Sequence, residues 1–167
     1  MRTAGLISVE EYLSTSYSPD CEYVSGAVVE RNVGEKDHGK LQRALIIWFH
    51  EHRRKLRAHV FPEQRIRVAA DRFRVPDICV VLGEEPMEQV FTAPPFICIE
   101  ILSPEDRLAA MQEKVQDFIR MGVPYVWIIN PRSREAFRCT ADGLQRVPEL
   151  RTEDPEIRIP LDELFAE

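Results

Sequence analysis

The fold is decided by residues 95–130, which read PFICIEILSPEDRLAAMQEKVQDFIRMGVPYVWIIN. The apolar run over 95–102 predicts a buried strand, and Pro104 suits the start of a helix that we expect over 105–121. A second apolar and aromatic run over 125–130 predicts a strand that is buried on both faces. Because a strand–helix–strand unit normally joins parallel strands by a right-handed crossover, this stretch predicts the centre of an α/β fold.

The flanking sequence adds one long helix and several short strands. Apolar residues recur at three- and four-residue steps over 38–57, which predicts an amphipathic helix. A short helix is expected over 8–16, a hairpin over 22–30 and a last helical turn over 161–166. Further strands are predicted at 58–61, 65–69, 73–81, 134–139, 144–147 and 156–159. This order favours a mixed β-sheet core flanked by α-helices, with antiparallel hairpin additions.

Length and composition indicate one soluble domain. The chain has 167 residues, of which 44% are hydrophobic and 30% charged, values typical of globular proteins. No apolar run approaches the roughly 18 residues that a membrane span needs, so we expect a cytoplasmic protein with no membrane partner. The four cysteines lie far apart without a C-x-x-C pair and are predicted to be free thiols rather than zinc ligands or disulfides.

The charge of the chain is distributed unevenly. The net charge is −6, which argues against wholesale, non-specific binding of nucleic acid. Residues 38–75, however, contain ten basic and only three acidic residues. This stretch indicates a face that guides a polyanion, with His38, Lys40, Arg65 and Arg67 as candidate nucleic-acid contacts. The alternatives are a solvated helix face and, for His38, a role as a simple helix cap.

Two carboxylates in apolar surroundings indicate a chemical function. Asp77 follows Pro76 at the mouth of a hydrophobic strand, and Glu100 interrupts the apolar run over 95–102. A buried Glu is costly without a partner, so a salt bridge, a metal ion or catalysis is expected to explain it. Two carboxylates on neighbouring strands suit Mg²⁺ or Mn²⁺. Phosphodiester cleavage also needs a positive charge, for which Lys114 is the candidate.

Lys114 falls at the border between the apolar and polar faces of the helix predicted over 105–121. From that position its ammonium group can reach the end of a strand. The alternative is a surface lysine that pairs with Asp117 or Asp106.

The order of these motifs resembles the PD-(D/E)XK signature of restriction endonuclease-like nucleases. That signature normally has a lysine two residues after the second acid, where this chain has Leu102. The chain is more similar to the Uma2-type endonuclease family, in which the lysine lies on the following helix, as Lys114 does. It departs from that family's pattern at Ala110 and Tyr125, where acids are usual. The resemblance covers about residues 8–147 and rests on Val9–Leu13, Glu22–Val29, His38, Val75–Asp77, Ile99–Pro104, Lys114, Gly122–Pro124, Trp127 and Asn130–Pro131.

The resemblance implies a single restriction endonuclease-like domain over 1–167 that hydrolyses DNA with Mg²⁺ or Mn²⁺. Asp77, Glu100 and the backbone carbonyl of Ile101 are the implied metal ligands. Lys114 is implied to orient the attacking water or to stabilise the charge of the transition state. Glu22 is implied to extend the acidic cluster.

Several alternatives stay open at this point. Glu22 can instead pair with an arginine such as Arg65 or Arg67, and Glu63 is a weaker candidate for its role. The chain can be a catalytically silent nuclease fold that binds nucleic acid or serves assembly, or a protein in which Glu100 and Lys114 form a buried structural ion pair. A homodimer suits the cutting of both strands of a duplex.

Overall fold

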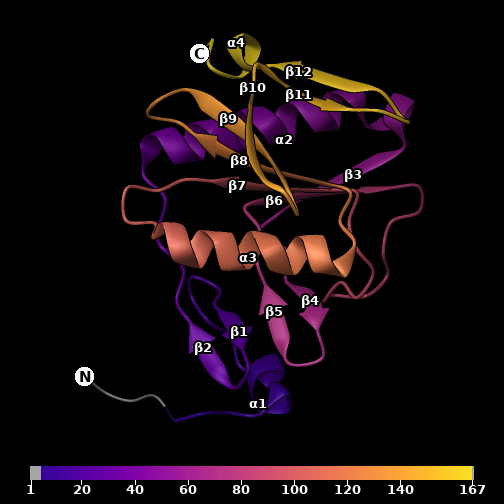
Figure 1. Ribbon diagram of the computed structural model, residues 1–167. Coiled ribbons are helices and arrows are strands. Elements are labelled where there is room, and N and C mark those ends of the chain that lie inside the picture. The colour runs from indigo at the N-terminus through magenta and orange to yellow at the C-terminus, as the bar shows by residue number, and fades with distance from the viewer. Residues whose placement is uncertain (1–4, 167) are drawn as a thin grey trace.

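A six-stranded mixed sheet forms the centre of the molecule in the computed structural model, which describes residues 5–166 (Figure 1). Strands β7 and β8 at its middle are parallel and are joined through α3 (Leu108–Met121), which confirms the predicted strand–helix–strand unit. The other pairings are antiparallel. In order across the sheet, the strands are β10 (Gly143–Val147), β9 (Glu135–Thr140), β8 (Tyr125–Asn130), β7 (Ile97–Ile101), β6 (Ile78–Leu82) and β3 (Ala58–Pro62).

Helices α2 (Lys36–Leu56) and α3 cover opposite faces of this sheet (Figure 1). Side chains alternate between the two faces along each strand. In β7, Ile97 and Ile99 therefore join the apolar cluster under α2, whereas Cys98 joins the cluster under α3. The predicted α/β class with two flanking helices is confirmed.

A second, four-stranded antiparallel sheet lies beyond α3 (Figure 1). Helix α1 (Val9–Ser14) packs on it through an aromatic cluster of Tyr12, Tyr23 and Phe73. In order, the strands are β2 (Ala27–Val29), β1 (Glu22–Val24), β5 (Arg72–Arg74) and β4 (Ile66–Ala69).

The strand predicted over 73–81 is wrong as one element, because the chain changes sheets within it. Strand β5 ends at Arg74 in the four-stranded sheet, and β6 begins at Ile78 in the six-stranded sheet. Pro76 lies between them and has no N–H to donate to a sheet ladder. The break places Asp77 at the junction of the two sheets.

Two further boundaries differ from the predictions. Helix α3 begins at Leu108 rather than near Pro104, because Asp106 closes a tight turn by accepting a hydrogen bond from the Ser103 N–H (2.6 Å). Near the C-terminus, β12 (Ile157–Pro160) pairs with β11 (Glu149–Thr152), a strand that the sequence did not predict. The hairpin and α4 (Leu161–Leu164) extend the apolar cluster under α2.

All four cysteines are free thiols and buried. Over residues 5–166, no helix has the length and apolar character that a membrane crossing requires.

Candidate functional site

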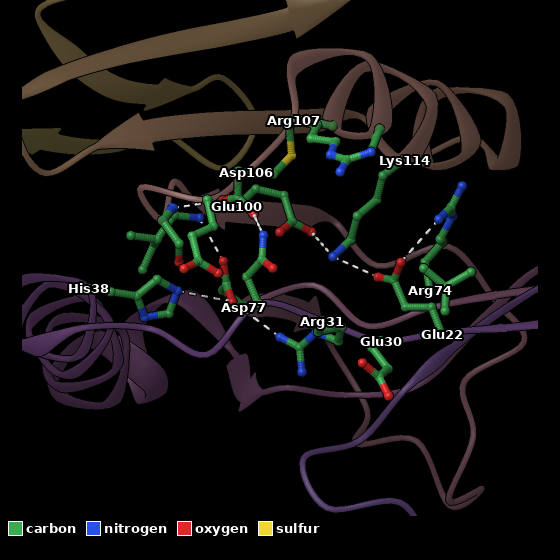
Figure 2. A pocket seen from close by; sticks show the side chains of 17 residues that line it. Glu22, Glu30, Arg31, His38, Arg74, Asp77, Glu100, Asp106, Arg107 and Lys114 are labelled. Atoms are coloured by element: carbon green, nitrogen blue, oxygen red, sulfur yellow. Dashed lines mark hydrogen bonds and ion pairs between the residues drawn. The ribbon is translucent and has the colours of Figure 1, made fainter. Parts of the chain in front are cut away.

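Five side chains predicted to belong to the site line one cavity of about 450 Å³ at the junction of the two sheets (Figure 2). Each of them comes from a different segment of the fold. The residues are Glu22 of β1, His38 of α2, Asp77 before β6, Glu100 of β7 and Lys114 of α3. Ile101 of β7 also lines the cavity.

Lys114 is the centre of this arrangement. Its Nζ lies 2.6 Å from Glu22 Oε1 and 2.9 Å from Glu100 Oε1, and it donates to the Val75 carbonyl at 2.8 Å. Burial by itself lowers the pKa of a lysine, but the neighbouring carboxylates of Glu100 and Glu22 raise the pKa of Lys114 above its ordinary value. The residue is buried and charged, so the alternative of a surface lysine paired with Asp117 or Asp106 is wrong.

Glu100 is buried to an extent that is unusual for a carboxylate. It is 2% exposed, and its Oε1 accepts no hydrogen bond, because the contact with Lys114 is close but lacks hydrogen-bond geometry. Burial raises the pKa of Glu100 to about 8; Lys114 lowers it, and Asp77 and Glu22 raise it further. This buried oxygen therefore meets the charge of Lys114 but accepts no hydrogen bond.

Asp77 is held from three sides. Its Oδ1 lies 3.2 Å from Arg31 Nη2 and 3.3 Å from His38 Nε2, and its Oδ2 accepts the Ile101 N–H at 2.7 Å (Figure 2). Burial raises the pKa of an aspartate, but the hydrogen bond from His38 and the charge of Lys114 outweigh burial and lower the pKa of Asp77. The carboxylate is therefore ionised and fixed in orientation.

Glu22 is tied into a buried network of charges. Its Oε2 lies 3.0 Å from Arg74 Nη1, and its Oε1 accepts the Val75 N–H at 3.0 Å. Arg74 Nε in turn donates to Asp117 of α3 at 2.7 Å. The alternative that Glu22 pairs with an arginine is therefore confirmed, but the partner is Arg74 rather than Arg65 or Arg67.

The basic residues proposed from charge do not gather at the cavity. Only His38 lines it, and its contact with Asp77 gives it more than a capping role. Lys40 lines a separate cavity of about 100 Å³. Arg65 pairs with Asp20, and Arg67 donates to the Ala70 carbonyl and lies over the Phe73 ring. Three basic residues of the stretch over 38–75 pair with carboxylates: Arg65, Arg72 and Arg74. Glu63 is exposed and does not line the cavity.

A family model described as a putative restriction endonuclease, Uma2, matches residues 9–166. The chain belongs to the Uma2 family. This match confirms the resemblance seen in the sequence and extends it beyond residue 147.

A solved structure from Anabaena variabilis, described as a putative nuclease belonging to DUF820, has the same fold. It matches this Uma2 chain with a TM-score of 0.81 and 21% identity, over 96% of this chain and 98% of the other. No curated protein matches the chain significantly.

The Uma2 site offers oxygen atoms to a divalent cation, but few of them. Within residues 5–166, no three His, Cys, Asp or Glu side chains are grouped to hold a metal ion. Mg²⁺ commonly binds through one or two carboxylates and keeps several waters. Asp77 and Glu100 provide such a pair, and the unused acceptor of Glu100 suits a hard cation. The residues therefore fit a partly hydrated Mg²⁺ or Mn²⁺.

Two charged residues of this Uma2 chain that contact the site, Arg31 and Arg74, were not predicted as site residues, and Asp117 was considered only as a partner of Lys114, whereas it pairs with Arg74. Arg74 directly precedes Val75-Pro76-Asp77, and this proximity to Asp77 was the only feature of the sequence that could have indicated Arg74 as a site residue. Arg31 lies in a segment without regular structure, and nothing in its neighbourhood predicts a partner 46 positions later.

Proposed function

We propose that this protein is a divalent-metal-dependent endonuclease that hydrolyses phosphodiester bonds in DNA. The observation that carries the proposal is the meeting of Asp77, Glu100 and Lys114, from three separate elements, on one open cavity. A closed, dry Glu100–Lys114 pair would have favoured a purely structural role. Here both residues line about 450 Å³ of accessible space.

Each residue has a distinct task in this proposal. Asp77, Glu100 and the Ile101 carbonyl hold Mg²⁺ or Mn²⁺, which polarises a phosphoryl oxygen and lowers the pKa of a bound water. Lys114 keeps its ammonium charge beside the reacting phosphate and stabilises negative charge there. Glu22 fixes the position of Lys114, and His38 fixes that of Asp77.

The test is cleavage of supercoiled plasmid with Mg²⁺ or Mn²⁺ by the wild type and three near-isosteric variants. Asp77→Asn, Glu100→Gln and Lys114→Met are each expected to lose cleavage by about a hundredfold or more, typical for the loss of a charge-stabilising group. Asp162→Asn, which changes an exposed carboxylate on α4, is the matched control and should cleave like the wild type. Circular dichroism checks that every variant is folded.

Cleavage that is equal in all variants would come from a contaminant and would reject this site. Binding of DNA without cleavage, at any metal concentration, would replace the proposal with the silent, nucleic-acid-binding alternative.

A further inference from the structure

Arg31 lies in the cavity wall and has no role in the proposed chemistry. It lies between β2 and α2, outside regular secondary structure, and its side chain is 11% exposed. Its guanidinium reaches into the cavity and donates to Asp77 Oδ1 at 3.2 Å (Figure 2). A long, flexible side chain is thus ordered against the carboxylate proposed to hold the metal.

A guanidinium and a divalent cation compete for this carboxylate. Asp77 Oδ2 already accepts the Ile101 N–H, and Asp77 Oδ1 contacts both His38 and Arg31. A cation that binds Asp77 therefore meets the positive charge of Arg31 at contact distance, where repulsion is strongest. An arginine stays charged in a protein, so the repulsion is relieved only if the Arg31 side chain leaves Asp77. Arg31 is the group that has to move.

Once it has left Asp77, the Arg31 side chain can bind an anion. The space beside it is the cavity in which the substrate phosphate would lie, and a guanidinium binds phosphate oxygens in a bidentate manner. We propose that Arg31 exchanges Asp77 for a phosphate of the nucleic-acid substrate when a divalent cation binds. This inference rests on the proposed function, because it assigns the cation to Asp77.

The exchange predicts opposite effects of one substitution on two ligands. In calorimetry with Mn²⁺ alone, Arg31→Gln should bind the ion about tenfold more tightly than the wild type, because the competitor is gone. Arg31→Lys keeps the charge and should stay near the wild type. Arg107→Gln removes a charge from an exposed residue of the same cavity wall and should change affinity by less than about threefold.

The second ligand is a labelled 20-base-pair duplex, measured by fluorescence anisotropy. With Ca²⁺ present, Arg31→Gln should bind it about tenfold more weakly than the wild type. With a chelator in place of Ca²⁺, the two proteins should bind equally, because Arg31 then stays on Asp77. The dependence on the cation separates exchange from a fixed phosphate contact.

The outcomes distinguish this inference from the proposed function. If the wild type and Arg31→Gln bind Mn²⁺ equally, and Asp77→Asn abolishes that binding, the metal site stands and the exchange is rejected. If no variant binds Mn²⁺, both are rejected. Binding of Mn²⁺ by Arg31→Gln alone would support the exchange in its strongest form.

Discussion

Asp117→Asn tests whether the buried charges beside the cavity hold the two sheets and α3 together. Asp117 is 4% exposed, and its Oδ2 accepts hydrogen bonds from Arg74 Nε at 2.7 Å and from Arg72 Nη2 at 2.9 Å. Both arginines belong to β5 of the four-stranded sheet, whereas Asp117 lies on α3. The substitution keeps the shape of the side chain and removes its charge.

The expected cost follows from the burial of the partners. Breaking a buried ion pair on one side typically costs about 3–5 kcal/mol. Arg72 is 21% exposed and Arg74 keeps Glu22, so the lower end of that range applies. We expect the free energy of unfolding to fall by about 3 kcal/mol, which lowers the melting temperature by about 6–12 °C in a chain of this size.

Urea denaturation followed by circular dichroism measures this loss. Glu113→Gln is the matched control, because Glu113 contacts Arg72 at 2.7 Å from the same helix but is 55% exposed. It should cost less than about 1 kcal/mol. Equal losses for the two variants would refute the reasoning, since burial then would not decide the strength of these pairs.

Three further predictions concern other parts of the molecule. Burial raises the pKa of Cys79 and Cys139 to about 12. A thiol reagent should therefore modify these cysteines in the native protein about a hundredfold more slowly than in the urea-unfolded chain. Comparable rates would show that the core opens readily. Because the pKa of Glu100 is raised to about 8, a proton competes with Mn²⁺ there, and Mn²⁺ affinity measured by calorimetry should rise between pH 6 and pH 8, by up to about tenfold per pH unit; Glu100→Gln should show a smaller rise, which then comes from His38 beside Asp77. Gly122→Ala should lower the free energy of unfolding, measured by urea denaturation, by about 1 kcal/mol because φ is +103° at this position. Gly39→Ala, on the exposed side of α2, should instead stabilise the protein slightly. An unchanged free energy of unfolding in Gly122→Ala would contradict the argument from backbone strain.

Local patterns were enough to predict the central unit of the fold. Strands β7 and β8 are apolar runs of the right length, and α3 has apolar residues at helical spacing that end at Gly122. Such signals lie within a few residues of one another, so no knowledge of the rest of the chain is needed. Two site residues were found in the same way, because a carboxylate at the mouth of an apolar strand (Asp77) or inside one (Glu100) is costly and needs an explanation.

The ends of the helices and strands, and the pairing partners of the strands, were harder to predict from the sequence. The switch between sheets at Pro76 was missed because a proline at the start of a strand and a proline between two strands have the same local pattern. Strand β11 was missed because its sequence is short and mostly polar, and it becomes a strand only by pairing with β12. In both places tertiary packing overrides a weak local preference.

The sequence by itself determined where the strand–helix–strand unit lies and that its two strands are buried, because an apolar run and its periodicity are properties of neighbouring residues. Only the tertiary structure decided which charges meet. Glu22 and Lys114 lie more than ninety positions apart and come within 2.6 Å, and Arg31 reaches Asp77 across 46 positions. The partner of a long charged side chain depends on how separate sheets and helices are placed, and no local pattern encodes that placement.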